Sequence, residues 1–151
     1  MTNAFNILIG LFVFFILWAL IEAQVYRVRR IKIKNSKIPK GFNNFKIIFI
    51  SDMHYGRSFS SKRLINIVNK INKIEPDIII IGGDYLDISV KSKRDVSRYL
   101  DKELQVLKKL KAKLGIFTVL GNHDYFKGKD YLLKKLNSNS FKIQIGRASC
   151  R

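Results

Sequence analysis

Hydrophobic residues follow two different patterns along the chain, and the first is an unbroken apolar run at the N-terminus. Residues 1–21 carry no charged side chain. Within them, positions 4–21 form a stretch that, as a helix rising about 1.5 Å per residue, spans roughly 27 Å, close to the thickness of a bilayer's hydrocarbon core. This run predicts one helix that crosses a membrane once.

Basic residues flank only the C-terminal end of this run. Seven Lys or Arg residues lie between positions 27 and 40, only Glu22 opposes them, and none precedes the run. The positive-inside rule therefore predicts a single-pass protein of the cell membrane whose remaining chain faces the cytoplasm and an anionic leaflet. A cleaved signal peptide is the alternative, but the run lacks a basic segment before it and Ile21-Glu22-Ala23 is a poor cleavage site.

From residue 45 onward, short apolar runs alternate with amphipathic segments. The apolar runs predict strands at 47–50, 78–81 and 116–120, with the start of a fourth at 141–143. The first of them has the composition of a strand buried on both faces. Apolar residues at helical spacing predict helices at about 61–74, 95–111 and 129–136. This alternation predicts a layered α/β fold with a largely parallel sheet.

Each of the first three predicted strands ends in a polar cluster. The clusters are Ser51-Asp52-Met53-His54, Gly83-Asp84-Tyr85-Leu86-Asp87 and Gly121-Asn122-His123-Asp124. Because sites in such sheets lie outside the carboxyl ends of the strands, we expect these side chains to meet at one edge. Both histidines of the chain belong to these clusters.

The clustered residue types suit a centre with two divalent metal ions. Asp52 and His54 can share one ion, Asp84 can bridge it to a second, and Asn122 offers the second ion a neutral oxygen. Mixed oxygen and nitrogen ligands fit Mn, Fe or Zn better than Ca or Mg. Two such ions suit the hydrolysis of a phosphate ester by a metal-activated water.

Two further residues are the candidate catalytic groups. We expect His123 to hydrogen-bond the leaving oxygen and Asp124 to orient that imidazole. Asp87 is either a hydrogen-bond acceptor behind the site or a turn residue. Three aromatic residues border the predicted site and either pack or contact substrate, and Arg57 either meets a phosphate or is solvated. The aromatic residues are Tyr55, Tyr125 and Phe126.

In this order, the three clusters resemble the first three motifs of the calcineurin-like metallophosphoesterases. The leading apolar helix and the run at 111–125 are similar to the membrane-anchored bacterial branch, some members of which act on phospholipid-like or nucleotide-sugar-lipid diphosphates such as UDP-diacylglucosamine. The resemblance implies that Asp52, His54 and Asp84 bind the first metal and that Asp84 and Asn122 bind the second. It also implies that His123 stabilises the transition state or protonates the leaving group.

The resemblance covers about residues 45–144, the first half of the family's domain. The family's later His motifs supply further ligands, and no His follows residue 123. The last seven residues, with Cys150, resemble a translated sequencing adapter. We therefore expect the reading frame to continue beyond this sequence and the fragment itself to be inactive. The predicted organisation is 1–25 membrane anchor, 26–44 basic linker, 45–144 half-domain and 145–151 non-native tail.

Charge and composition narrow the function classes. The chain is 47% hydrophobic, enough for a core, and its single Cys excludes a disulfide framework. Its net charge of +18 indicates a nucleic acid or an anionic membrane as partner, although a Lys-, Ile- and Asn-rich composition also follows from A/T-rich codons.

The leading hypothesis is a phosphoesterase for a lipid-linked phosphodiester or diphosphate at the membrane surface. A nuclease or cyclic-nucleotide phosphodiesterase is the enzymatic alternative, and a polybasic membrane-binding module is the non-catalytic one. The predicted anchor disfavours a nucleic-acid substrate, because it confines the site to a surface where a lipid substrate already lies.

Overall fold

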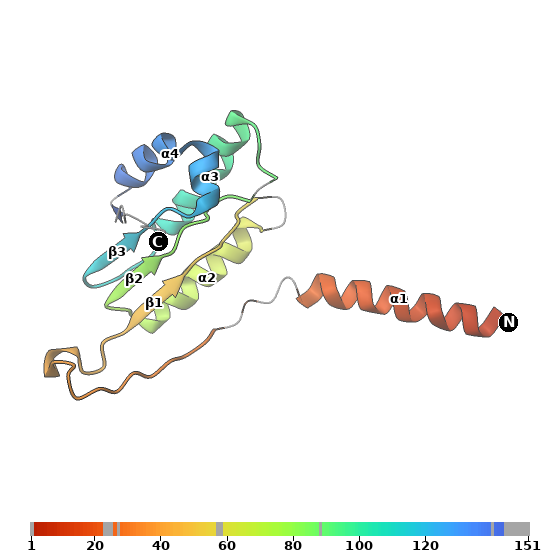
Figure 1. Cartoon of the computed structure of the whole chain (residues 1–151), viewed down its shortest axis with the longest axis horizontal. Helices are drawn as coiled ribbons and strands as arrows, with labels where there is room; N and C mark the ends of the chain where they lie inside the picture. Colours follow the sequence, from red (N-terminus) through yellow and green to blue (C-terminus); the bar gives the residue numbers. More distant parts are fainter. Residues whose placement is uncertain are drawn as a thin grey trace, which may run out of the picture. The chain divides into compact units, whose positions relative to one another are not determined.

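A computed structural model describes residues 2–22, 26, 28–56, 59–87, 89–139 and 141–143 of the chain (Figure 1). The chain divides into two compact units, Met1–Lys40 and Gly41–Arg151, and each is described by itself. The predictions for Arg57 and for the tail at 145–151 fall outside the described residues.

The first unit contains the helix that the N-terminal apolar run predicts. Helix α1 spans Thr2–Glu22, and its stretch Ala4–Glu22 has a mean hydropathy of 2.6, with none of its residues buried. By length and composition, this helix can cross a membrane. Residues 28–35 have no regular structure, and a short 3-10 helix, η1, follows at Lys40–Phe42.

The second unit is built on a parallel four-stranded sheet. Its strands are β1 (Ile47–Ile50), β2 (Ile78–Ile81), β3 (Gly115–Thr118) and β4 (Lys142–Ile143). Their order in the sheet is β1-β2-β3-β4, which is also their order in the chain, and Figure 1 shows the first three side by side. The predicted α/β class with a parallel sheet is confirmed.

Three helices connect or follow these strands: α2 (Ser61–Ile74), α3 (Lys93–Leu107) and α4 (Asn122–Asn137). The side chains of Ser60 and Ser92 cap α2 and α3, because each accepts a hydrogen bond from a backbone N–H in the first turn. Helix α3 ends earlier than predicted, since the chain leaves the helix after Leu107 in a turn.

Helix α4 is the larger departure from the prediction, which placed it at about 129–136. It begins at Asn122, inside the third polar cluster, with Gly121 as its N-cap residue. The Asp124 carboxylate accepts a hydrogen bond from the Gly121 N–H at 2.9 Å, as acidic residues at this helix position commonly do. At Gly128 the backbone is not helical (φ 111°, ψ 72°), so the first turn is separated from the rest of the helix.

The helices cover one face of the sheet. Strands added in chain order by right-handed crossovers place all their helices on the same side, and α3 packs against both α2 and α4. The core between helices and sheet includes Leu64, Ile79, Ile81, Leu100 and Leu107, all fully buried.

The opposite face of the sheet is open among the described residues. Ile47 and Phe49 of β1 are 57% and 66% exposed, and their partners in the parallel register, Ile78 and Ile80, are half-buried. The prediction that 47–50 is buried on both faces is therefore wrong. The run has the apolar composition of a strand buried on both faces, but the single layer of helices covers only one face of the sheet.

Candidate metal centre

The first two polar clusters lie side by side because the backbone pairing of β1 and β2 continues beyond the strands. The Asp52 N–H donates to the Gly83 carbonyl at 3.2 Å, and the His54 N–H donates to the Asp84 carbonyl at 3.1 Å. Tyr55 then donates to the Tyr85 carbonyl at 2.7 Å. These bonds fix the two loops in register, so their side chains emerge at the same edge of the sheet.

Three candidate ligands have a left-handed backbone. The φ angles of Asp52, His54 and Asp84 are 54°, 44° and 53°, a region that costs an L-residue roughly 1–2 kcal/mol. The inter-loop hydrogen bonds hold these angles in place. Three of the five described non-glycine residues with a positive φ are thus residues that the sequence predicts as ligands, as expected of a preorganised site.

These three side chains converge. One ligand atom from each of Asp52, His54 and Asp84 lies within 4.8 Å of the others. The Asp84 carboxylate is nearly buried, whereas the side chains of Asp52 and His54 are 64% and 37% exposed, so the cluster opens to solvent on one side. Two carboxylates and one imidazole form a donor set that suits a divalent cation of the Mn, Fe and Zn group. The residues thus fit the metal that the sequence predicts.

Two glycines let the second and third clusters touch. Gly83 has a φ of 88°, and a Cβ there would lie 2.2 Å from the backbone nitrogen of Gly121. A Cβ on Gly121 would lie 2.1 Å from Oδ1 of Asp84. Because no side chain separates them, the His123 N–H reaches the same Oδ1 and donates to it at 2.9 Å. The third cluster therefore orients a candidate metal ligand of the second.

The Asp124 side chain links the loop that contains Asp84 to the loop that contains Gly121. Its buried carboxylate accepts hydrogen bonds from the backbone N–H groups of Asp84 (2.8 Å), Tyr85 (3.0 Å) and Gly121 (2.9 Å). Burial raises the pKa of this carboxyl, and the three bonds oppose the rise. These contacts differ from the predicted role of orienting the His123 ring, because both oxygens serve backbone donors. They make Asp124 a positioning residue for the two loops.

His123 lies beside the three converging side chains. Its ring centroid is 5.3 Å from that of His54, with the rings nearly perpendicular. Asn122 is exposed at the first position of α4. The roles of His123 as an acid and of Asn122 as a ligand to a second ion stay predictions.

The aromatic residues near the clusters divide into two kinds. Tyr55 is 2% exposed and packs in the core, whereas Tyr125 is 48% and Phe126 is 87% exposed. Asp87 accepts a hydrogen bond from the Ser89 N–H at 2.7 Å, as a turn residue does.

One buried group was missed by the sequence analysis. Glu103 of α3 is fully buried, and neither of its carboxyl oxygens has a hydrogen-bond partner among the described residues. Burial, and to a smaller extent the charge of Asp124, raises the pKa of Glu103 well above its usual value. Its helical spacing from Leu100 and Leu107, both on the apolar stripe of α3, was the signal for its burial.

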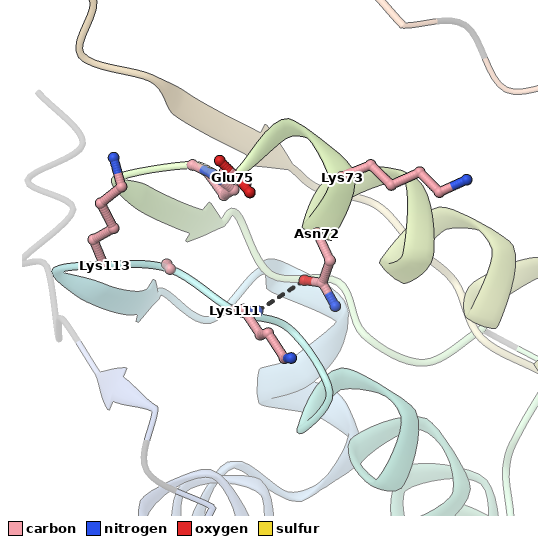
Figure 2. A pocket seen from close by; sticks show the side chains of 7 residues that line it. Asn72, Lys73, Glu75, Lys111 and Lys113 are labelled. Atoms are coloured by element: carbon pink, nitrogen blue, oxygen red, sulfur yellow. Dashed lines mark hydrogen bonds between the residues drawn. The ribbon is translucent and has the colours of Figure 1, made fainter.

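A hollow of about 600 Å³ lies at the other end of the sheet, where β2 and β3 begin (Figure 2). Its lining includes Lys73, Glu75, Lys111 and Lys113, and Asn72 accepts a hydrogen bond from the Lys111 N–H at 2.9 Å. Figure 2 shows the three lysine side chains pointing away from one another. Their ammonium groups therefore do not converge on a common ligand position.

Comparison with known proteins agrees with this geometry. The sequence model of the calcineurin-like phosphoesterase family matches residues 45–149. An uncharacterized metallophosphoesterase of Aquifex aeolicus is 34% identical over 128 residues, which cover 85% of this chain and 46% of that protein. A transmembrane protein with metallophosphoesterase domain from Danio rerio is 31% identical over 104 residues, which cover 69% of this chain and 22% of that protein.

A third relative, the uncharacterized metallophosphoesterase YkuE of Bacillus subtilis, is 32% identical over 105 residues, or 70% of this chain and 35% of that protein. The chain thus spans less than half the length of these curated relatives. No solved structure matches it. With the family match extending over more than half of its length, the chain belongs to the calcineurin-like phosphoesterase family.

Proposed function

We propose that the protein is a metal-dependent phosphoesterase that works at the membrane surface on a lipid-linked phosphodiester or diphosphate. The observation that carries the proposal is the convergence of Asp52, His54 and Asp84 within 4.8 Å at the carboxyl edge of a parallel sheet. Family membership supports the reaction class, because the converging side chains lie in the two clusters that resemble the first two motifs of this family.

We assign separate roles to the residues of the site. Asp52, His54 and Asp84 would hold one divalent ion, and Asp84 with Asn122 would hold a second. When bound, such ions act as Lewis acids toward the phosphate and lower the pKa of a water molecule. His123, whose ring lies next to that of His54, would donate a proton to the leaving oxygen, and Asp124 keeps the Asp84 and Gly121 loops in contact.

The membrane location and the substrate class rest on the N-terminal unit. Helix α1 is long and apolar enough to span a bilayer, and the basic residues after it favour a cytoplasmic domain beside an anionic leaflet. One relative is named as a transmembrane protein with a metallophosphoesterase domain. A tethered site favours a substrate that diffuses in the same membrane. Nucleic acid is the less favoured partner.

The first test is metal binding by the full chain in detergent, followed by the loss of the free Mn²⁺ signal in electron paramagnetic resonance. We expect Asp52→Ala to weaken binding on the order of tenfold or more, because one of three donors is lost. Asp101→Ala is the matched control, since this carboxylate on α3 pairs with Lys135 at 2.7 Å. Equal affinities of wild type and Asp52→Ala would refute the assigned centre.

The second test compares substrates on the whole protein. We expect hydrolysis of a lipid diphosphate in mixed vesicles to exceed that of single-stranded DNA and of cyclic nucleotides. Faster hydrolysis of either nucleotide substrate would favour the alternative.

A further inference from the structure

Two neighbouring aromatic side chains next to the candidate metal centre are left in solvent. Phe126 is 87% exposed, more than any other large hydrophobic residue with a described side chain, and Tyr125 is 48% exposed. We call Tyr125 and Phe126 the aromatic pair. They follow His123 and Asp124 directly, so they stand on the same turn of α4 as a candidate catalytic group.

The helix break at Gly128 affects where Tyr125 points. In an unbroken helix, residues seven positions apart share a face, so Tyr125 would lie on the side of Leu132, which is 5% exposed in the core. Gly128 has a φ of 111°, which glycine adopts readily and other residues do not. Because of the break, the residues before Gly128 do not have to share a face with the buried residues after it.

The chemistry of this surface is that of a bilayer interface. Aromatic rings beside lysine ammonium groups are typical of segments that lie at the headgroup layer. The Lys129 ammonium lies 5.2 Å from the centre of the Tyr125 ring. Residues 41–144, which include this surface, contain 20 Lys and Arg against 10 Asp and Glu, a positive balance that complements an anionic leaflet. A site for a water-soluble phosphoester would not require exposed aromatic side chains next to the candidate metal ligands.

The segment between α1 and the second unit is long enough for this surface to reach the bilayer. Between Glu22 and the second unit, which begins at Gly41, lie 18 residues, which extend to at most about 60 Å. This length lets any face of the second unit touch the membrane that holds α1, so surface chemistry rather than chain length selects the face.

We propose that the aromatic pair inserts into the headgroup layer of the bilayer that holds α1 and brings the metal-binding edge of the sheet to the lipid surface. This proposal rests on the membrane location proposed above. It deepens that proposal by naming the surface through which the site meets a lipid-linked substrate.

The test uses single-tryptophan variants of the full chain in vesicles of phosphatidylcholine and phosphatidylglycerol. Trp18→Phe removes the only tryptophan, and Phe126→Trp then places the probe in the aromatic pair. Two matched probes use the same background. Phe49→Trp lies on the open face of the sheet, and Leu114→Trp, at a site 55% exposed, lies where β3 begins.

We expect lipids with brominated acyl chains to quench the probe at position 126 roughly twofold or more strongly than the probes at positions 49 and 114, as an interfacial aromatic would be. Equal quenching at all three positions, or stronger quenching at position 49, would overturn the proposal. A probe at position 126 that is shifted to the blue but not quenched would show that protein covers it, and would overturn it as well.

A second variant tests the effect of the helix break on Tyr125. Gly128→Ala favours a continuous helix that turns residue 125 toward the core, so we expect it to reduce the quenching of a Tyr125→Trp probe in the same background. Unchanged quenching would contradict the orienting role of Gly128.

Mn²⁺ binding and phosphodiester hydrolysis are measured on whole protein carrying the same probes. Quenching without hydrolysis would refute the proposed function and keep the membrane contact. Hydrolysis without quenching would refute the contact alone.

Discussion

We predict that replacing Glu103 by Gln removes a loss of folding stability that the wild type shows as the pH rises above 4.5. The carboxyl group is fully buried without a hydrogen-bond partner among the described residues, and burial raises its pKa well above the usual value of 4.5. In the folded chain the group therefore keeps its proton at a pH where the unfolded chain has released it. Folding must then take up a proton, and the free energy of unfolding falls as the pH rises above 4.5.

The size of the effect follows from the width of this pH window. Each pH unit above 4.5 costs about 1.4 kcal/mol while Glu103 stays protonated, so the penalty between pH 4.5 and pH 7 is at most about 3.4 kcal/mol. A glutamine has no proton to take up. At pH 4 the two side chains are both neutral and similar in shape, so wild type and Glu103→Gln should then unfold at similar temperatures.

The assay is thermal unfolding of the full chain in detergent, followed by circular dichroism at pH 4 and pH 7. We expect Glu103→Gln to raise the melting temperature of the second unit at pH 7 by on the order of 10 °C and to leave it nearly unchanged at pH 4. Other titrating groups are common to both proteins and cancel in the comparison. Asp101→Asn, which removes a carboxylate paired with Lys135 at 2.7 Å, is the control and should not raise the melting temperature at pH 7.

An equal shift at both pH values would refute the reasoning. It would mean that Glu103 is ionised in the folded chain, and a buried ionised carboxylate needs a positive partner.

The remaining predictions concern the site and the anchor. In the whole protein, Asp84→Ala should lose bound metal and activity together, as measured by metal content and turnover, because Asp84 is expected to bridge both ions. His123→Ala should keep its metal while turnover falls on the order of 100-fold, with partial rescue by a p-nitrophenolate leaving group; equal metal loss would make His123 a ligand. Gly121→Ala should weaken Mn²⁺ binding in paramagnetic resonance, because its Cβ would lie 2.1 Å from Oδ1 of Asp84. Reporters fused after Lys40 should be active only as cytoplasmic reporters, and an active periplasmic fusion would reverse the predicted topology.

The sequence predicted the strands well because their signals are local. The runs at 47–50 and 78–81 are continuous apolar segments bounded by polar residues, and the structure has strands at those positions. The convergence of Asp52, His54 and Asp84 was also predictable, since parallel strands bring their carboxyl ends to one edge.

The missed features depend on contacts between distant segments. The run 47–50 does not show whether helices cover one face of the sheet or both, so the exposure of Phe49 could not be predicted from the run alone. The start of α4 was missed because Asn122 and His123 were interpreted only as site residues, although Asp124 is also a helix-capping residue. Two of the three backbone donors to Asp124, Asp84 and Tyr85, lie in one loop 40 and 39 residues before it, and the third is Gly121; no sequence pattern reports that this loop and Asp124 meet.

The agreement between strand order and chain order has a consequence for how the protein assembles during synthesis. A growing chain leaves the ribosome N-terminus first, at about 5–20 residues per second, and each new strand of this sheet joins the edge formed just before it. Asp52, His54 and Asp84 are thus all present once β2 and its following turn have emerged. Gly121 and Asp124, which hold the Asp84 loop in place, arrive only after β3, so the nascent chain gains its candidate metal ligands before it gains the contacts that make them rigid.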